Sequence, residues 1–215
     1  MQVDRAHYCP DLSTAYSDAP QPIGHRATIS APHMHASAAE SILPYLDPPA
    51  AFPTRSVRVL DIGSGSGYLT HVLAELAFAN KANKAGEVVG VEHISQLTEL
   101  GRTNMAKSAD GRTFLEGGRV KFVTADGRNG HVSTESSAQS EDEGWDAIHV
   151  GAAAKTIHPE LIEQLRKPGR MFIPVDDDEY GGSQHIWLVD KDEKGEVRTR
   201  KLFGVTYVPL TDAPA

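Results

Sequence analysis

From Val57 onward, the sequence alternates short apolar runs with stretches whose apolar residues recur at helical spacing. The run 57–62 has the character of a β-strand, and Leu69, Val72, Leu73 and Leu76 then share one face of a helix. The same alternation predicts further strands at 87–92, 120–125, 145–150 and 171–175, and helices at 95–107, with Ser95 as N-cap, and at 159–166. This order favours a doubly wound α/β fold, whose mostly parallel sheet is covered by helices on both faces.

The two ends of the chain interrupt this pattern. Residues 1–32 are rich in proline and lack periodicity, which predicts an irregular arm before a short helix from about His33 to Pro44. At the other end, the runs 184–189 and 197–208 flank the turn-rich segment 191–195 and predict an antiparallel hairpin. The polar inserts 80–86, 108–118 and 133–144 and the acidic run 176–179 are expected to form solvated loops.

The length and charge of the chain narrow its class. Its 215 residues suit one domain, and 29 acidic against 21 basic side chains give a formal net charge of −8, which argues against nucleic acid as the main partner. No apolar run reaches the ~18 residues of a membrane-spanning helix and the start is not typical of a signal peptide, so we expect a soluble, cytoplasmic protein without membrane contact. The single cysteine, Cys9, excludes an intrachain disulfide and a multi-cysteine zinc site, and we expect an inert thiol.

A glycine-rich segment at 61–67 closes the first predicted strand and opens the first predicted helix. Glycines in such a turn let the backbone approach a ligand closely, although a tight turn with only a structural role would look the same. The spacing is G-x-G-x-G over Gly63, Gly65 and Gly67, with Asp61 two residues ahead of the first glycine. The fingerprint of dinucleotide-binding proteins is G-x-G-x-x-G, and Tyr68 stands where its third glycine would be. The segment therefore favours a nucleoside ligand without a pyrophosphate.

Acidic residues stand at the ends of three successive predicted strands: Asp61, Glu92 and Asp126. In doubly wound sheets, the carboxyl ends of the strands form the edge where ligands bind. Glu92 is suited to accept hydrogen bonds from both hydroxyls of a ribose, and Asp126 lies where an adenine could be held. Each acid alone could be a solvated loop residue, but three at one edge indicate an adenosine ligand, with S-adenosylmethionine as the obvious candidate.

Five segments closely resemble the protein-L-isoaspartate (D-aspartate) O-methyltransferase family: 27–36, 60–67, 126–128, 146–154 and 207–211. The similarity runs from about Asp4 to Thr211, and the segments 29–36 and 148–154 are not shared by methyltransferases generally. The resemblance implies a single Rossmann-like methyltransferase domain, with a substrate and active-site arm at 1–56, a cofactor-binding core at 57–175 and a C-terminal hairpin at 176–215. Two departures from the family pattern are expected. The sequence that begins at Met1 is expected to lack the helical segment that most members carry ahead of the position of Val3, and the acidic run 176–179 is expected to replace a glycine-rich stretch.

The resemblance also implies an activity and a set of site residues. The activity is methyl transfer from S-adenosyl-L-methionine, without a metal ion, to the abnormal carboxylate of L-isoaspartyl or D-aspartyl residues in damaged proteins and peptides. The ester would then close to a succinimide that can reopen to aspartate, and the enzyme is expected to be a monomer. Ser30 is the implied active-site residue. Glu92 and His93 resemble the pair that contacts the ribose, and Asp126 and Gly127 the pair at the adenine. The other implied cofactor contacts are Ala27, Thr28, Ile29, His35, Asp61, Gly63, Ser64, Gly65, Gly67 and Thr211.

The residues also indicate what the substrate carboxylate, which is the nucleophile, would need from the protein. A carboxylate is already ionised at neutral pH, so it needs no general base, and Ser30 could orient it by donating a hydrogen bond. A serine just ahead of Pro32 could also be a simple turn or helix cap.

The His-Met-His run at 33–35 lacks a predicted third ligand, so a metal site is a poor interpretation. A nicotinamide dehydrogenase, which the glycine spacing disfavours, and a non-catalytic binding module, which the intact strand-end acids disfavour, stay open as alternatives.

Overall fold

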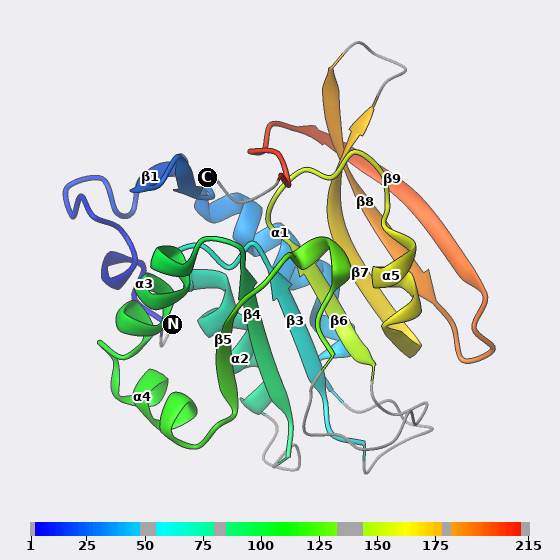
Figure 1. Ribbon diagram of the computed structural model, residues 1–215, viewed down its shortest axis with the longest axis horizontal. Helices are drawn as coiled ribbons and strands as arrows, with labels where there is room; N and C mark the ends of the chain where they lie inside the picture. The colour runs from blue at the N-terminus through cyan, green and yellow to red at the C-terminus, as the bar shows by residue number, and fades with distance from the viewer. Residues whose placement is uncertain (1–2, 48–54, 80–84, 133–143, 178–181, 212–215) are drawn as a thin grey trace.

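The computed structural model describes residues 3–47, 55–79, 85–132, 144–177 and 182–211. A seven-stranded sheet lies at its centre, with the strand order β5-β4-β3-β6-β7-β8-β9 (Figure 1). β3 to β7 are parallel, whereas β8 pairs antiparallel with β7 and β9 antiparallel with β8. The predicted α/β fold with a mostly parallel sheet and a C-terminal antiparallel hairpin is therefore confirmed. The strands are β3 (Arg58–Ile62), β4 (Glu87–Glu92), β5 (Val120–Thr124), β6 (Trp145–Val150), β7 (Leu165–Asp177), β8 (Ser183–Lys191) and β9 (Val197–Val205).

Helices cover both faces of this sheet (Figure 1). They are α1 (Pro32–Ile42), followed by the 3-10 turn η2 (Leu43–Tyr45), α2 (Tyr68–Ala79), α3 (Ser95–Met105), α4 (Ala109–Glu116), the 3-10 turn η3 (Gly127–Asn129) and α5 (Pro159–Glu163). Successive strand residues point to opposite faces, so that in β3 Val59 joins the core under α1, α2 and α3, and Leu60 joins the core under α5. Because both faces are buried, the central strands are apolar almost throughout, as the sequence pattern predicts.

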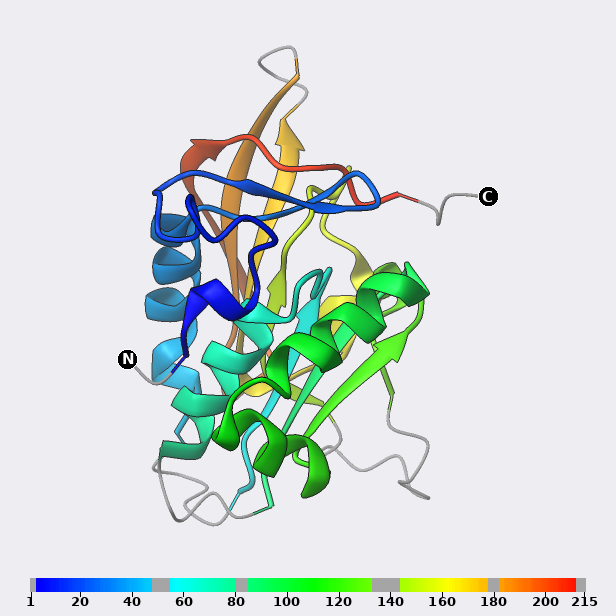
Figure 2. The same cartoon turned by 90° about the vertical axis from the view of Figure 1, so that its left-hand side faces the viewer.

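The N-terminal arm is more ordered than the sequence predicts. It contains a 3-10 turn, η1 (Arg5–His7), and an antiparallel hairpin of β1 (Gln21–Gly24) and β2 (Ala27–Ile29). The prediction of an irregular arm was wrong because these strands are too short to show a periodicity. Figure 2 shows the arm in dark blue, crossing above the carboxyl ends of the parallel strands.

Two local predictions also need correction. The insert 108–118 is not a loop: it forms α4, and the Oγ of Ser108 accepts a hydrogen bond from the backbone nitrogen of Gly111 at 3.0 Å as its N-cap. Ser95 is not the N-cap of α3, because the helix starts at Ser95 itself and Ile94 occupies the cap position without a side-chain bond. The backbone nitrogen of Ile94 donates to the carboxylate of Glu92 at 3.1 Å, so the acid at the end of β4 fixes the residue that precedes the helix.

The C-terminal third differs mainly in boundaries. α5 ends at Glu163 and β7 begins at Leu165, so the chain becomes extended earlier than expected, and β9 ends at Val205, three residues before the predicted limit. Asp176 and Asp177 belong to β7 and are partly buried instead of lying in a solvated loop, and the Asp177 carboxylate pairs with Lys201 and with His185 at 3.1 Å. The rest of the acidic run, the insert 133–143 and residues 80–84 lie outside the described residues.

Candidate functional site

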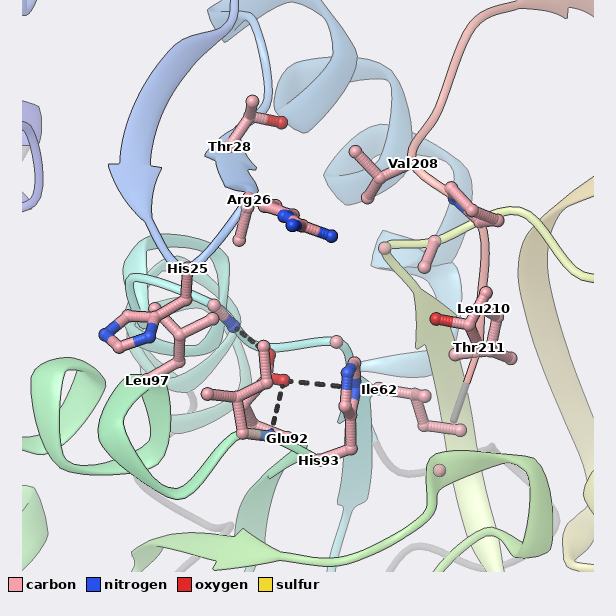
Figure 3. A pocket seen from close by; sticks show the side chains of 18 of the residues that line it. His25, Arg26, Thr28, Ile62, Glu92, His93, Leu97, Val208, Leu210 and Thr211 are labelled. Carbon is pink, nitrogen blue, oxygen red and sulfur yellow. Dashed lines mark hydrogen bonds and ion pairs between the residues drawn. The ribbon is translucent and has the colours of Figure 1, made fainter. Parts of the chain in front are cut away.

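A cavity of about 430 Å³, here the first cavity, opens at the carboxyl ends of β3 and β4. It therefore lies at the edge where doubly wound sheets bind ligands. One wall is the β1–β2 turn, and the facing wall is the segment after β9, as Figure 3 shows with Arg26 on one side and Leu210 on the other. The lining residues are 25–28, Ile62, Gly63, Gly65, Val91, Glu92, His93, Ile94, Leu97, Gly127, Gly151, Ala152 and 208–211.

The structure brings many of the predicted cofactor residues to this cavity. Those that line it are Ala27, Thr28, Gly63, Gly65, Glu92, His93, Gly127 and Thr211. They come from five separate stretches of the chain. The sheet order explains why most of them meet: β4 and β6 both pair with β3, and β5 pairs with β4, so the loops after these strands are neighbours.

Glu92 connects the floor of the first cavity to the glycine-rich turn. Its side chain is only 5% exposed, and its Oε2 accepts a hydrogen bond from the backbone nitrogen of Gly65 at 3.1 Å. Its Oε1 accepts the bond from Ile94 and lies 3.3 Å from Nδ1 of His93, as the dashed lines in Figure 3 mark. A carboxylate offers about four acceptor positions, so Glu92 keeps capacity for the two hydroxyls of a ribose.

Asp61 holds the glycine-rich turn from below. It is 1% exposed, its Oδ1 lies 2.7 Å from Nδ1 of His149, and its Oδ2 accepts a hydrogen bond from the hydroxyl of Thr70 at 2.5 Å. Ser64, in the same turn, has a buried hydroxyl without a hydrogen-bond partner among the described residues. A buried hydroxyl of this kind is costly unless a ligand or water satisfies it, so the turn fits a polar ligand.

Gly67 has a packing role that the glycine spacing alone does not reveal. Its φ is +83°, and a Cβ at this position would lie 2.9 Å from Cα of Gly101 and 3.0 Å from the ring of Phe122. Only glycine therefore lets the start of α2 pack this closely against α3. Gly67 does not line any of the three cavities described here, so its contact with the cofactor stays a prediction.

Asp126 is likewise engaged elsewhere in the fold. Its carboxylate accepts hydrogen bonds from Nε and Nη2 of Arg128, at 2.9 and 2.7 Å, and from the backbone nitrogen of the same residue at 3.0 Å. These bonds hold the pKa of Asp126 below its usual value. The neighbouring Gly127 lines the first cavity, so at this strand end the backbone reaches the cavity while the predicted acid binds an arginine.

Ser30 lies in a second cavity, also of about 430 Å³. Its wall includes Ser30, the start of α1 and the segment 204–208, and it shares Thr28, Gly151 and Val208 with the first cavity. The Tyr207 hydroxyl forms a hydrogen bond with Ser30, and burial raises the pKa of Tyr207 to about 12. Two cavities that meet at three shared residues can hold two ligands whose reacting atoms face each other.

A smaller cavity of about 30 Å³ lies under this junction and is lined by residues that the sequence predicts for the site. Ile29, Ser30, His35, Asp61 and Ser64 all contribute to it. Burial, with smaller effects from the charges of Arg5 and His149, lowers the pKa of His35 to about 3. His35 is therefore neutral at physiological pH.

The sequence reasoning misses the β1–β2 turn of the first cavity, although it includes the C-terminal segment 207–211. His25 and Arg26 adopt left-handed backbone conformations, with φ of 51° and 59°, and bring the β1–β2 turn over the first cavity. Neither residue is a glycine, so Gly24, with φ of 89°, is the one residue of this turn whose type favours the left-handed conformation. The segment 208–211 reaches the site through the hydrogen bonds that Ala153 makes with Val208 and Leu210, at 2.8 and 2.7 Å.

The described residues hold no group of three or more histidine, cysteine or acidic side chains that could bind a metal ion. Nor does any helix within the described ranges have the length and apolar character needed to cross a membrane. Burial raises the pKa of the Cys9 thiol, so this side chain stays protonated at neutral pH.

Comparison with known proteins identifies what this arrangement is similar to. The sequence profile of the family described as protein-L-isoaspartate(D-aspartate) O-methyltransferase matches residues 1–215. The protein-L-isoaspartate O-methyltransferase of Triticum aestivum is 40% identical over 213 residues, which cover 99% of this chain and 82% of that protein. That of Caenorhabditis elegans is 40% identical over 209 residues, covering 97% and 81%. A solved structure from Plasmodium falciparum, described as a protein-L-isoaspartate O-methyltransferase in complex with S-adenosyl-L-homocysteine, has a TM-score of 0.79 at 31% identity and covers 98% of this chain and 87% of that one.

Proposed function

The chain belongs to the protein-L-isoaspartate(D-aspartate) O-methyltransferase family, and we propose that its two connected cavities hold the two reactants of a protein-repair reaction. The enzyme transfers a methyl group from S-adenosyl-L-methionine to the free carboxylate of L-isoaspartyl residues in damaged proteins and peptides, and acts in the same way on D-aspartyl residues. The first cavity receives the adenosine part of S-adenosylmethionine, and the second receives the abnormal residue. The observation that carries this proposal is the junction of the cavities at Thr28, Gly151 and Val208, next to Ser30.

The residues of the first cavity suit the cofactor chemically. Glu92 accepts the hydrogen bonds of the ribose hydroxyls, and the buried Ser64 hydroxyl lines the small cavity next to it and offers a further polar contact. The backbone at Gly63, Gly65 and Gly127 lines the cavity without side chains, which leaves room for a ligand against the main chain. When bound, S-adenosylmethionine supplies a sulfonium methyl group, which the carboxylate oxygen takes as the carbon–sulfur bond breaks and its electron pair stays on sulfur.

The chain's own contribution to the reaction is to position and shield the nucleophile. An isoaspartyl carboxylate has a pKa near 4, so it is ionised at neutral pH and no residue has to remove a proton. Ser30 donates a hydrogen bond to this carboxylate and keeps one oxygen directed at the methyl group, while Tyr207 holds the serine. Correct positioning of two reactants can contribute up to ~7 to 11 kcal/mol to catalysis. The neighbouring backbone nitrogen then attacks the carbonyl carbon of the methyl ester, and the methoxy group leaves as methanol with the amide proton. This closes a succinimide without further help from the enzyme.

Three finer points belong to the same proposal. The enzyme works as a monomer, and light scattering of the purified protein tests this. It needs neither nucleic acid nor a membrane to act. It is located in the cytoplasm, which cell fractionation tests.

Paired peptides test the function directly. The protein is incubated with radiolabelled S-adenosylmethionine and three peptides of one sequence, containing L-aspartate, L-isoaspartate or D-aspartate, and base-labile methyl ester is counted. We expect label on the isoaspartyl peptide, slower labelling of the D-aspartyl peptide, and none on the normal one. Equal labelling of the L-aspartyl and L-isoaspartyl peptides would contradict the repair function. A calorimetric titration with nicotinamide adenine dinucleotide, which should show no binding, tests the dehydrogenase alternative.

A further inference from the structure

A buried arginine from the N-terminal arm reaches the residues around the small cavity. Arg5 is 4% exposed, its Nε donates to the carbonyl oxygen of Ala15 at 2.9 Å, and its Nη2 donates to the carbonyl oxygen of Ser30 at 2.8 Å. Its Nη1 lies 3.2 Å from Nδ1 of His35. One guanidinium thus joins the arm, the backbone of Ser30 and the ring of His35.

The chemistry of the guanidinium decides which form of His35 can be present. Arginine has only N–H donors, so the Nδ1 of His35 has to be the acceptor in this contact. A neutral imidazole that accepts at Nδ1 carries its proton on Nε2. The contact with Arg5 therefore selects the Nε2–H tautomer, and the second ring nitrogen of His35 is a donor.

Tyr68 keeps the two side chains in this arrangement. Its ring centroid lies 5.0 Å from that of His35, and the guanidinium carbon of Arg5 lies 5.3 Å from the same centroid. The other charged or titratable groups near His35 are Asp61 and His149, which line the small cavity with it. His149 is bonded to Asp61, so the hydrogen bond with Arg5 sets the tautomer of His35.

We infer that Arg5 is a positioning residue for methyl transfer, which fixes the backbone of Ser30 and holds His35 as an Nε2–H donor in the small cavity that adjoins the two reactant cavities at Thr28 and Gly151. This inference rests on the proposed function, because it assigns Ser30 and His35 to the reacting site. A neutral N–H donor suits the carboxylate of either reactant, whereas an imidazole nitrogen with a lone pair would repel it. Arg5 acts through these two residues and is not itself a catalytic residue.

Tyr8 offers a matched control in the same arm. It is buried, and its hydroxyl lies 2.5 Å from Nδ1 of His71, in a contact that involves neither Ser30 nor His35. Loss of either the Arg5 or the Tyr8 contact removes a buried hydrogen bond between the arm and the rest of the protein. Only the loss of Arg5 changes the reacting site.

Nuclear magnetic resonance of the full chain with ¹⁵N-labelled histidine reads the tautomer without any variant of Arg5. Long-range proton–nitrogen correlations distinguish Nε2–H from Nδ1–H rings, and the His35 signals are those missing from the His35→Gln variant. We expect a neutral Nε2–H ring at neutral pH. An Nδ1–H tautomer, or a protonated ring, would overturn the inference even if the enzyme is fully active.

Kinetics of two variants test the consequence for the reaction. With saturating S-adenosylmethionine and an isoaspartyl peptide, Arg5→Met should lower kcat/KM by about 100-fold, because a misplacement of ~1 Å has an effect of that order. Tyr8→Phe should lower the unfolding temperature but keep the wild-type kcat/KM below it. A folded Arg5→Met variant with wild-type kcat/KM, or an equal loss in both variants, would overturn the inference. If the wild-type chain methylates no isoaspartyl peptide, the proposed function fails, and the resonance experiment still decides whether Arg5 sets the His35 tautomer.

Discussion

Asp61 and His149 stand directly opposite each other in the β3–β6 ladder, and Oδ1 of the acid lies 2.7 Å from Nδ1 of the imidazole. Both side chains are buried under the glycine-rich turn. A carboxylate can only accept in this contact, so the Nδ1 of His149 carries a proton, whereas the Nδ1 of His35 accepts from Arg5. An acidic and a basic side chain thus give opposite hydrogen-bonding roles to the Nδ1 atoms of two histidines that line one small cavity.

Replacing Asp61 should lower the free energy of unfolding. Asp61→Ala leaves His149 and the hydroxyl of Thr70 without their buried partner, and removal of one member of a buried pair typically costs about 3 to 5 kcal/mol. Urea unfolding measures this loss. Thr70→Val is the control, because it removes only the hydroxyl contact and should cost about 1 kcal/mol. If the two variants are equally stable, the Asp61–His149 pair does not contribute to the stability of the fold.

Glu92 is predicted to be the strongest polar contact with the cofactor. Glu92→Ala removes hydrogen bonds to a charged acceptor, each worth ~1.5 to 3 kcal/mol, so the affinity for S-adenosylmethionine should fall at least about tenfold. Isothermal titration calorimetry measures it. Glu99→Gln, an exposed change on α3, is the control and should leave the affinity unchanged. Unchanged affinity in Glu92→Ala would exclude Glu92 from the ribose contact.

The parts of the site that the sequence predicts are those attached to regular elements. Asp61 and Glu92 lie at the carboxyl ends of β3 and β4, whose apolar runs are clear in the sequence, and the glycine-rich turn follows β3. The order of the sheet therefore brings these residues to one edge. The hydrogen bond between Arg5 and Ser30 joins residues 25 positions apart through a short arm, and no periodicity records it. Tyr207 reaches Ser30 only because β9 ends early and the chain turns back toward the site.

The glycine positions show why sequence spacing cannot assign a role by itself. Gly65 and Gly67 belong to one motif and both have positive φ, yet Gly65 lines the first cavity while Gly67 packs against Gly101. The same holds for the strand-end acids, since Glu92 lines the cavity and Asp126 binds Arg128. The identity of each residue follows from the motif, but its contacts depend on neighbours that are distant in the sequence.

Ser30 should affect the chemical step and not cofactor binding. If it orients an ionised carboxylate, Ser30→Ala loses one charge-assisted hydrogen bond of ~1.5 to 3 kcal/mol, or roughly 10- to 150-fold in kcat/KM. Calorimetry should show unchanged affinity for S-adenosylmethionine, and circular dichroism checks the fold. Ser95→Ala, at an exposed helix start, is the control. A variant rate that newly rises tenfold per pH unit would instead indicate a lost general base, contrary to the mechanism.

The Tyr207 hydroxyl should stay protonated near neutral pH and hold Ser30 in place there. Its pKa is raised to about 12, so the hydroxyl does not titrate near neutral pH and the rate should show no step from this group there. Tyr207→Phe removes the partner of Ser30, which should lower kcat/KM by roughly 2- to 13-fold for a neutral bond of ~0.5 to 1.5 kcal/mol. Steady-state rates on an isoaspartyl peptide measure this. An effect as large as that of a charged contact would mean that Tyr207 binds the substrate carboxylate itself.

Two buried histidines should make the protein sensitive to acid. Burial lowers the pKa of His71 to about 4 and that of His35 to about 3, whereas both titrate near 6.5 when the chain is unfolded. Between these values the unfolded state binds more protons than the folded one, so the free energy of unfolding is at its full value above about pH 6.5 and falls as the pH drops toward 4. Each histidine can add a slope of up to about 1.4 kcal/mol per pH unit. Urea unfolding at several pH values measures the slope for the wild type and for His71→Gln, with the exposed His33→Gln as control. The slope should decrease in His71→Gln alone, and a slope that stays at the wild-type value there would show that His71 is not held neutral by the fold.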